Sequence, residues 1–143
     1  MTSVSSAGFE LIDHTADVAV RAWGASPERV FEQAALGMAS LAYDVAAVEP
    51  RERHEVRLEA PDRELLLAAW LNELLYLMEA RRLVFAAFVV ERLGGKELAA
   101  VVVGERLDPA RHHVHAVVKA ATLHDLSLRQ SDRGWEGHVL LDV

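Results

Sequence analysis

Acidic groups near both ends of the 143-residue chain are the ones whose types and positions could do chemistry. Asp142 is followed by Val143, so a side-chain carboxylate lies next to the chain carboxylate. Asp17 closes the sequence HTAD at 14–17 and would supply a third anion if the two ends meet in the fold. Oxygen anions gathered in this way suit calcium, magnesium or manganese. The first hypothesis is therefore a site for a hard divalent cation.

Each of these features also has an ordinary structural explanation. Thr and Asp before a strand are common turn formers, because their side chains bond to nearby backbone groups. Asp142 could be a polar chain end. However, the apolar run 139–141 that precedes it favours an end held in a sheet. In an alternating strand, Asp142 shares a face with His138 and Leu140.

Glu73 is a further candidate, on a predicted helix. Its neighbours three and four positions away include no basic residue, since they are Ala69, Trp70, Tyr76 and Leu77. An ionised carboxylate on such a face is costly to bury unless a cation or several donors meet it. Two explanations stay open: such a partner exists, or this edge of the helix reaches water.

Three histidines form the last candidate group, at His112, His113 and His115. On a strand, His113 and His115 share a face and could bind a transition metal. A solvated hairpin tip is the favoured explanation, because no third ligand of matching softness is apparent. The sequence contains no glycine-rich nucleotide loop, no G-x-S-x-G elbow and no CxxC pair.

Length and composition narrow the class of protein. The chain is long enough for one domain with a sizeable core, which we expect over 9–143, with 1–8 as a flexible tail. A net charge of -7 argues against broad binding to nucleic-acid phosphates. The longest apolar stretch, 65–78, is interrupted by Asn72 and Glu73 and is too short to span a bilayer. We expect a cytoplasmic protein without a membrane partner.

Two helices are predicted to carry the core. Ser26 before Pro27 is an N-cap with a first-turn proline, and the apolar spacing that follows predicts a helix from 27 to the low forties. Asp62 begins a second helix that runs to about Arg81. This helix is apolar on nearly every side, so we expect it to lie centrally in the core.

Alternating apolar residues predict the strands. The expected strands cover 17–23, 54–60, 84–93, 97–103 and 135–143, with Gly94 and Gly95 as a tight hairpin turn. The segment 114–129 is expected to form either one long bent strand or two strands. The predicted fold class is α+β, with a mixed, mostly antiparallel sheet and two main helices packed against it in a single compact domain.

Several short motifs occur along the chain from Phe9 onward: HTADV at 14–18, RAWG at 21–24, FEQAA at 31–35, LNELL at 71–75, GE at 104–105, VKAAT at 118–122 and LDV at 141–143. In the order and spacing of these motifs the chain resembles the archease family. Two departures bear on local geometry: Ala19 stands where the family frequently has glycine, and Leu123 stands where it frequently has tyrosine.

The resemblance implies an accessory protein that is not itself a catalyst. Archeases activate the RtcB-type RNA-splicing ligase, which joins RNA ends through a guanylylated histidine of its own. They promote its guanylylation and multiple turnover in tRNA splicing and RNA repair. An acidic site that delivers or orders a divalent metal would fit this role, because guanylylation develops negative charge on phosphate oxygens. RNA would then be held by the ligase.

The resemblance also assigns residues. The metal-binding positions of the family fall on Asp17, Asp142 and Val143 of this sequence. Glu73 matches a helix position near that cluster, which implies a supporting residue or a transient ligand. His14 and Lys119 match further family positions, to which we assign site shaping.

Two other function classes stay open at this stage. A metal-dependent phosphoester hydrolase could use the same three carboxylates with Glu73 as general base. A general chaperone or small-molecule-binding module has only the apolar second helix in its favour, and that helix is better explained as core.

The proposed ligand Val143 predicts an asymmetry between tags at the two ends. An extension after Val143 would convert its carboxylate into a neutral amide carbonyl and add bulk to the site. Because ligand charge tunes hard-metal affinity over orders of magnitude, a tag after Val143 should weaken manganese binding markedly. A tag before 1–8 should have no effect. Equal manganese affinities of the two tagged proteins, measured by titration, would show that Val143 is not a ligand.

Overall fold

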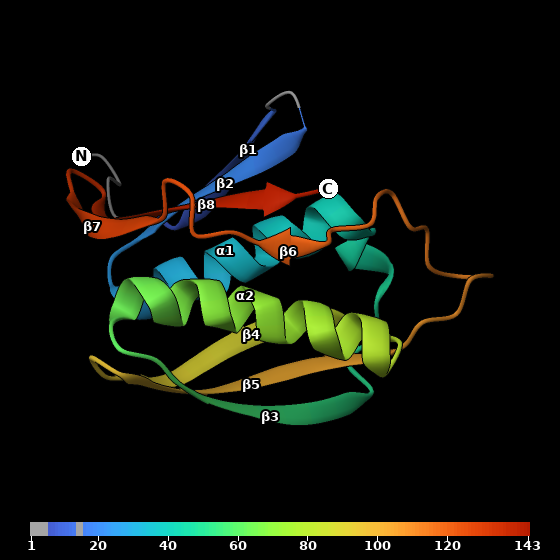
Figure 1. Cartoon of the computed structure of the whole chain (residues 1–143). Coiled ribbons are helices and arrows are strands. Elements are labelled where there is room, and N and C mark those ends of the chain that lie inside the picture. Colours follow the sequence, from blue (N-terminus) through green and yellow to red (C-terminus); the bar gives the residue numbers. More distant parts are fainter. Residues whose placement is uncertain (1–5, 14–15) are drawn as a thin grey trace.

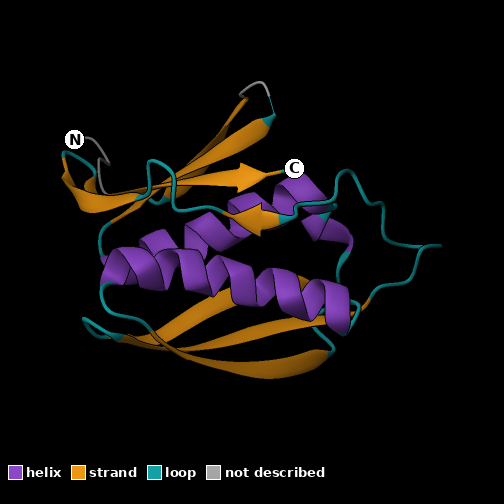
Figure 2. Ribbon diagram, viewed as in Figure 1, coloured by secondary structure: helices purple, strands orange, loops and turns teal. Residues whose placement is uncertain are grey.

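Two antiparallel sheets enclose a layer of two helices in the computed structural model, which describes residues 6–13 and 16–143 (Figures 1 and 2). The helices are α1 (Pro27–Ala42) and α2 (Arg63–Ala80), and a short 3-10 turn, η1 (Val45–Ala47), follows α1. The first sheet has the order β1 (Gly8–Asp13), β2 (Asp17–Gly24), β8 (Gly134–Asp142) and β6 (Ala120–Ala121), and β7 (Ser127–Ser131) also pairs with β8. The second sheet has the order β3 (Glu52–Glu59), β5 (Glu97–Arg106) and β4 (Leu83–Leu93).

Both helices begin at the predicted caps. The Ser26 hydroxyl accepts a hydrogen bond from the backbone N–H of Arg29 at 3.3 Å, ahead of Pro27. The Asp62 carboxylate accepts one from the backbone N–H of Leu65 at 2.8 Å. Each side chain satisfies a donor that the first turn leaves without a helical partner, so both helix starts are confirmed.

The central position expected for α2 is also confirmed. It lies between the two sheets, and residues around most of its circumference are buried, among them Leu66, Trp70 and Leu74. The buried Trp70 indole N–H donates to the backbone oxygen of Phe31 on α1 at 2.9 Å, which ties the two helices together. No helix in the described part of the chain is long and apolar enough to cross a bilayer.

The α+β class is confirmed, whereas some details of the strand prediction are wrong. The strands form two separate sheets with the helices between them, in place of one sheet with helices packed against it. The strand β1 was not predicted; it pairs with β2 along its whole length, from Gly8 opposite Trp23 to Asp13 opposite Val18. The other predicted strands appear as β2, β3, β4, β5 and β8.

The segment 114–129 is not one long strand; of the two alternatives, two strands is the one that the structure shows, although both are shorter than expected. Most of the segment is loop, with β6 and the start of β7 as its only strands in the described structure. Its backbone groups bond elsewhere: the N–H of His115 donates to Ala42 at the end of α1, and the N–H of Lys119 donates to Asp142. Asp125 has a φ of 55°, a left-handed conformation that interrupts any strand. An alternating pattern forms a strand only where a neighbouring strand can pair with it.

Tyr43 connects the end of α1 to the second sheet. Its side chain is 2% exposed. The hydroxyl donates to the backbone oxygen of Phe85 at 3.0 Å and accepts from the Phe85 N–H at 2.7 Å. Both bonds lie next to a shift in the pairing register of β4 and β5, which occurs from Phe85 to Ala87. The hydroxyl therefore satisfies backbone groups at an irregular point of the ladder.

Tyr43→Phe should therefore destabilise the fold by about 1–3 kcal/mol, because it leaves buried backbone groups of Phe85 without a partner. Tyr76→Phe removes a hydroxyl from a side chain that is 58% exposed and should change stability by less than about 0.5 kcal/mol. Urea unfolding of the two variants measures the difference. Equal midpoints would show that the Tyr43 hydroxyl contributes nothing.

Candidate functional site

Asp17 and Asp142 lie directly opposite each other in the first sheet. Asp17 is the first residue of β2 and Asp142 is the last of β8, and the antiparallel register pairs them. Directly opposite residues project from the same face with Cβ atoms about 4.5–5.5 Å apart. Since Val18 and Leu141, the next pair, are buried, the two carboxylates lie on the face away from the helices. We call Asp17 and Asp142 the acid pair.

The acid pair forms no salt bridge within the described residues. Both side chains are half-buried, and neither forms a salt bridge with any described basic group. Like charges directly opposite each other destabilise a sheet, and loss of water around them increases the cost. A hard cation between the two carboxylates would remove this repulsion, so the donors present fit such an ion.

The other predicted site residues include one ligand, Val143, and a supporting residue, His14. Val143 directly follows Asp142 and is exposed, and its oxygens are main-chain atoms. His14 lies outside the described residues. In the segments 6–13 and 16–143, no group of three His, Cys, Asp or Glu side chains could hold a metal ion. A three-ligand site here would therefore need main-chain oxygens in addition to the acid pair.

Lys119 is brought next to the acid pair through its backbone. Its N–H donates to the backbone oxygen of Asp142 at 2.7 Å, and the following residue, Ala120, lies opposite Asp142 in the sheet. The side chain is exposed and has no salt bridge to a described residue. The structure thus brings together Asp17, Asp142, Val143 and Lys119 from three segments of the chain.

Glu73 is less closely connected to this site. The neighbouring Asn72 ties α2 to β6: its amide donates to the backbone oxygen of Ala121 at 3.0 Å and accepts from the Ala121 N–H at 2.9 Å. Glu73 itself is half-buried, and its carboxylate makes no hydrogen bond or salt bridge within the described chain. Of the two explanations left open by the sequence, an edge of the helix that reaches water agrees with this environment.

Comparison with known proteins now decides the family. The sequence profile of the archease protein family matches residues 9–143. The chain belongs to the archease family. The archease of Methanosarcina mazei is 38% identical over 94% of this chain and 95% of its own, and that of Thermococcus gammatolerans is 39% identical over 94% and 98%.

Solved structures share the archease fold described above. The solution structure of Methanobacterium thermoautotrophicum protein 1598 has a TM-score of 0.82 and 36% identity, and the match covers 95% of this chain and 99% of that one. A crystal structure from Thermotoga maritima, described as an archease and possible chaperone, has a TM-score of 0.63. At 18% identity over 94% of this chain and 96% of that one, the second match supports the fold alone.

The histidine segment of this archease contains two kinds of environment. His113 and His115 are exposed on the loop 107–119, with ring centroids 5.0 Å apart, so they lie together but on a loop in place of the expected strand. His112 is buried. Its Nδ1 accepts from the backbone N–H of Asp108 at 2.8 Å, which places the ring hydrogen on Nε2, 2.9 Å from the carboxylate of Glu105.

Sequence reasoning missed the buried charge cluster around Glu105. This carboxylate, on a residue that is 4% exposed, accepts from the His112 ring, the Arg111 guanidinium and the backbone N–H of Glu49 at 2.7 Å. Arg51 adds a salt bridge at 3.3 Å. The available signal was a glutamate at the end of the apolar strand 98–104, six and seven residues before Arg111 and His112. The cluster fixes the start of the loop 107–119 to β5.

Hydrogen bonds, first from Arg111 and then from the Glu49 N–H, lower the pKa of Glu105 from its usual 4.5 to about 2, against the opposing effect of burial. The folded state therefore holds the proton less tightly than the unfolded chain. The stabilisation is present above about pH 4.5 and is lost as the pH falls toward 2.

Glu105→Gln should accordingly lower the thermal midpoint at neutral pH, and its deficit should shrink as the pH falls from 4.5 toward 2. Melting curves across this range test the expectation, with Glu91→Gln on β4 as a control for the same charge change at an exposed position. A deficit that is independent of pH would show that the Glu105 charge is not responsible.

Proposed function

We propose that this chain activates an RtcB-type RNA-splicing ligase by promoting its guanylylation and multiple turnover, with a hard divalent cation bound at the acid pair. Membership of the archease family supports the role. The observation that carries the metal proposal is the pairing of Asp17 with Asp142, two half-buried carboxylates without a salt bridge in the described structure. Calcium, manganese and magnesium are the candidate ions, because all ligands are oxygens.

Each residue of the site has a separate role in this proposal. Asp17 and Asp142 would hold the ion, with the main-chain oxygens of Val143 beside them. The ion would supply positive charge that offsets negative charge developing on phosphate oxygens during guanylylation. The backbone bond from Lys119 holds the end of β8 in place. Glu73 and His14 are proposed supporting residues, Glu73 on the neighbouring helix.

The charge of the whole chain agrees with a protein partner in preference to RNA. A net charge of -7 disfavours direct phosphate binding. It would instead speed encounter with a ligase whose RNA-binding cleft is basic, since complementary potentials steer association. In this proposal the RNA stays with the ligase, in the cytoplasm.

The hydrolase alternative has no specific observation in its favour. It requires Glu73 to act as a general base next to the metal ligands. No hydrogen bond or salt bridge joins Glu73 to the acid pair in the described structure. The same purified protein, incubated with manganese and a panel of phosphoesters, should release no product, whereas turnover would favour the hydrolase.

Asp17→Asn and Asp142→Asn should each reduce single-turnover guanylylation of the cognate ligase by on the order of tenfold or more, because one anion of the site is lost. Glu91→Gln, an exposed charge change on the other sheet, should stimulate the ligase normally. Normal stimulation by either aspartate variant would show that the acid pair is not the functional site.

Melting curves provide a second readout that does not depend on the ligase. Manganese should raise the thermal midpoint of the unmodified protein and leave that of Asp17→Asn unchanged, because a ligand stabilises only the state that binds it. In chelator, Asp17→Asn should be at least as stable as the unmodified protein, since repulsion within the acid pair is relieved. A variant that melts earlier in chelator would indicate a structural role for Asp17 instead.

A further inference from the structure

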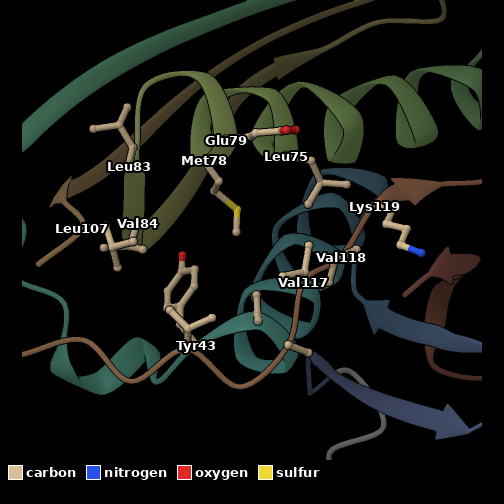
Figure 3. Close-up of a pocket in the computed structure, with 13 residues that line it drawn as sticks. Tyr43, Leu75, Met78, Glu79, Leu83, Val84, Leu107, Val117, Val118 and Lys119 are labelled. Carbon is tan, nitrogen blue, oxygen red and sulfur yellow. The ribbon is translucent and has the colours of Figure 1, made fainter. Parts of the chain in front are cut away.

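An apolar cavity of about 450 Å³ opens between α2, the start of β4 and the loop 107–119 (Figure 3). We call it the groove. Leu75 and Met78 line it from α2, Leu83 from β4, and Val117 and Val118 from the loop. Val117 is 74% exposed, which is unusual for a valine beside an apolar cavity. Exposed apolar surface that is concave and contiguous commonly marks a binding site.

The loop wall of the groove is held in place by the rest of the fold. The backbone N–H of Asp44 donates to the His113 oxygen at 3.3 Å, and that of His115 donates to the Ala42 oxygen at 2.8 Å. Two residues beyond Val117, Lys119 is bonded to Asp142. With the Glu105 cluster at its start, the loop is anchored on both sides of Val117. The groove is therefore preformed, which lowers the entropy cost of binding.

Two exposed charges of opposite sign flank the apolar lining. Glu79 comes from α2 and Lys119 from the loop, and Figure 3 shows them on different sides of the cavity. Neither has a salt-bridge partner in the described chain. An uncharged ligand, or one with a single charge, would leave Glu79 or Lys119 without a partner of opposite charge. A protein segment with an apolar side chain between a basic and an acidic residue would match the lining and both charges.

The groove is also continuous with the acid pair. Lys119 lines the groove, while its backbone N–H binds the Asp142 oxygen at 2.7 Å. The two residues from Val117 to Lys119 span at most about 7 Å. A partner bound in the groove would therefore lie next to the end of the first sheet, where the acid pair is.

We propose that the groove is the docking surface for the ligase, and that it takes a segment in which an apolar side chain is flanked by a basic and an acidic residue. Val117 and Met78 contact the apolar side chain, Glu79 pairs with the basic residue and Lys119 with the acidic one. This inference rests on the proposed function, because it names how the same partner is held.

The test varies the groove and measures two quantities separately: the protein concentration that gives half-maximal ligase guanylylation, and the maximal stimulation. Val117→Asp places an unpaired charge against the apolar lining and should raise the half-maximal concentration by about tenfold or more. Maximal stimulation at saturation should stay unchanged. Val89→Asp, at a valine 48% exposed on the second sheet, is the matched control and should change neither quantity.

Glu79→Lys tests the charge match without altering the apolar lining. It should raise the half-maximal concentration as well, and the effect should weaken in high salt because the contact is exposed. Val117→Asp or Glu79→Lys with an unchanged half-maximal concentration would overturn the docking proposal. The docking proposal would also be overturned if Val117→Asp changed self-association, measured by light scattering, and left the half-maximal concentration unchanged.

The failure of the proposed function is a different result. In that case the unmodified protein does not stimulate guanylylation at any concentration. The docking proposal is then tested on its own by calorimetric titration of the ligase, without nucleotide. One titration uses the unmodified protein and the other uses Val117→Asp. Weaker binding of Val117→Asp supports the docking surface, and equal or undetectable binding of both proteins overturns it.

Discussion

The three-layer architecture follows from the burial requirement of α2. α2 has buried apolar residues around most of its circumference, and only a narrow side that includes Tyr76 and Glu79 is exposed, so the helix needs cover from two directions. One sheet can cover only one of its faces. The strands therefore divide into two sheets, and the Trp70 bond to Phe31 sets α1 alongside α2 within the same layer. The expectation of one sheet failed at this point, although the apolar character of α2 was evident in the sequence.

Division into two sheets obliges the chain to cross the helix layer. The loop 107–119 makes this crossing, from β5 in the second sheet to β6 in the first. A crossing segment has no neighbouring strand along most of its length, which explains why 114–119 is loop despite its strand-like composition. Its backbone groups bond to the end of α1 and to Asp142 instead. The groove is the space that this crossing leaves beside α2.

The sequence predicted the helices well because caps and apolar spacing are local signals. It also predicted that Asp17 and Asp142 could meet, and the register of β2 against β8 places them opposite each other. The Glu105 cluster and the groove were not predictable in the same way. Glu105 is recognisable only when Arg111, His112 and Glu49 are known to converge on it. Arg111 and His112 are close to Glu105 in the sequence, but the turn that brings them back to it and the contact with the distant Glu49 depend on the tertiary fold.

The register of β2 against β8 explains how the fold tolerates the acid pair. Val18 opposite Leu141 and Val20 opposite Val139 are buried against the helices, and a slip of one residue would turn these apolar side chains to the other face. The core therefore holds Asp17 opposite Asp142 whatever their mutual repulsion costs. The sheet cannot relieve this repulsion by shifting its register. A cation bound between the two carboxylates would remove the repulsion, and this would increase its affinity. Because the Lys119 backbone joins this end of β8 to the wall of the groove, a cation at the acid pair and a partner on the groove would be held at a fixed separation.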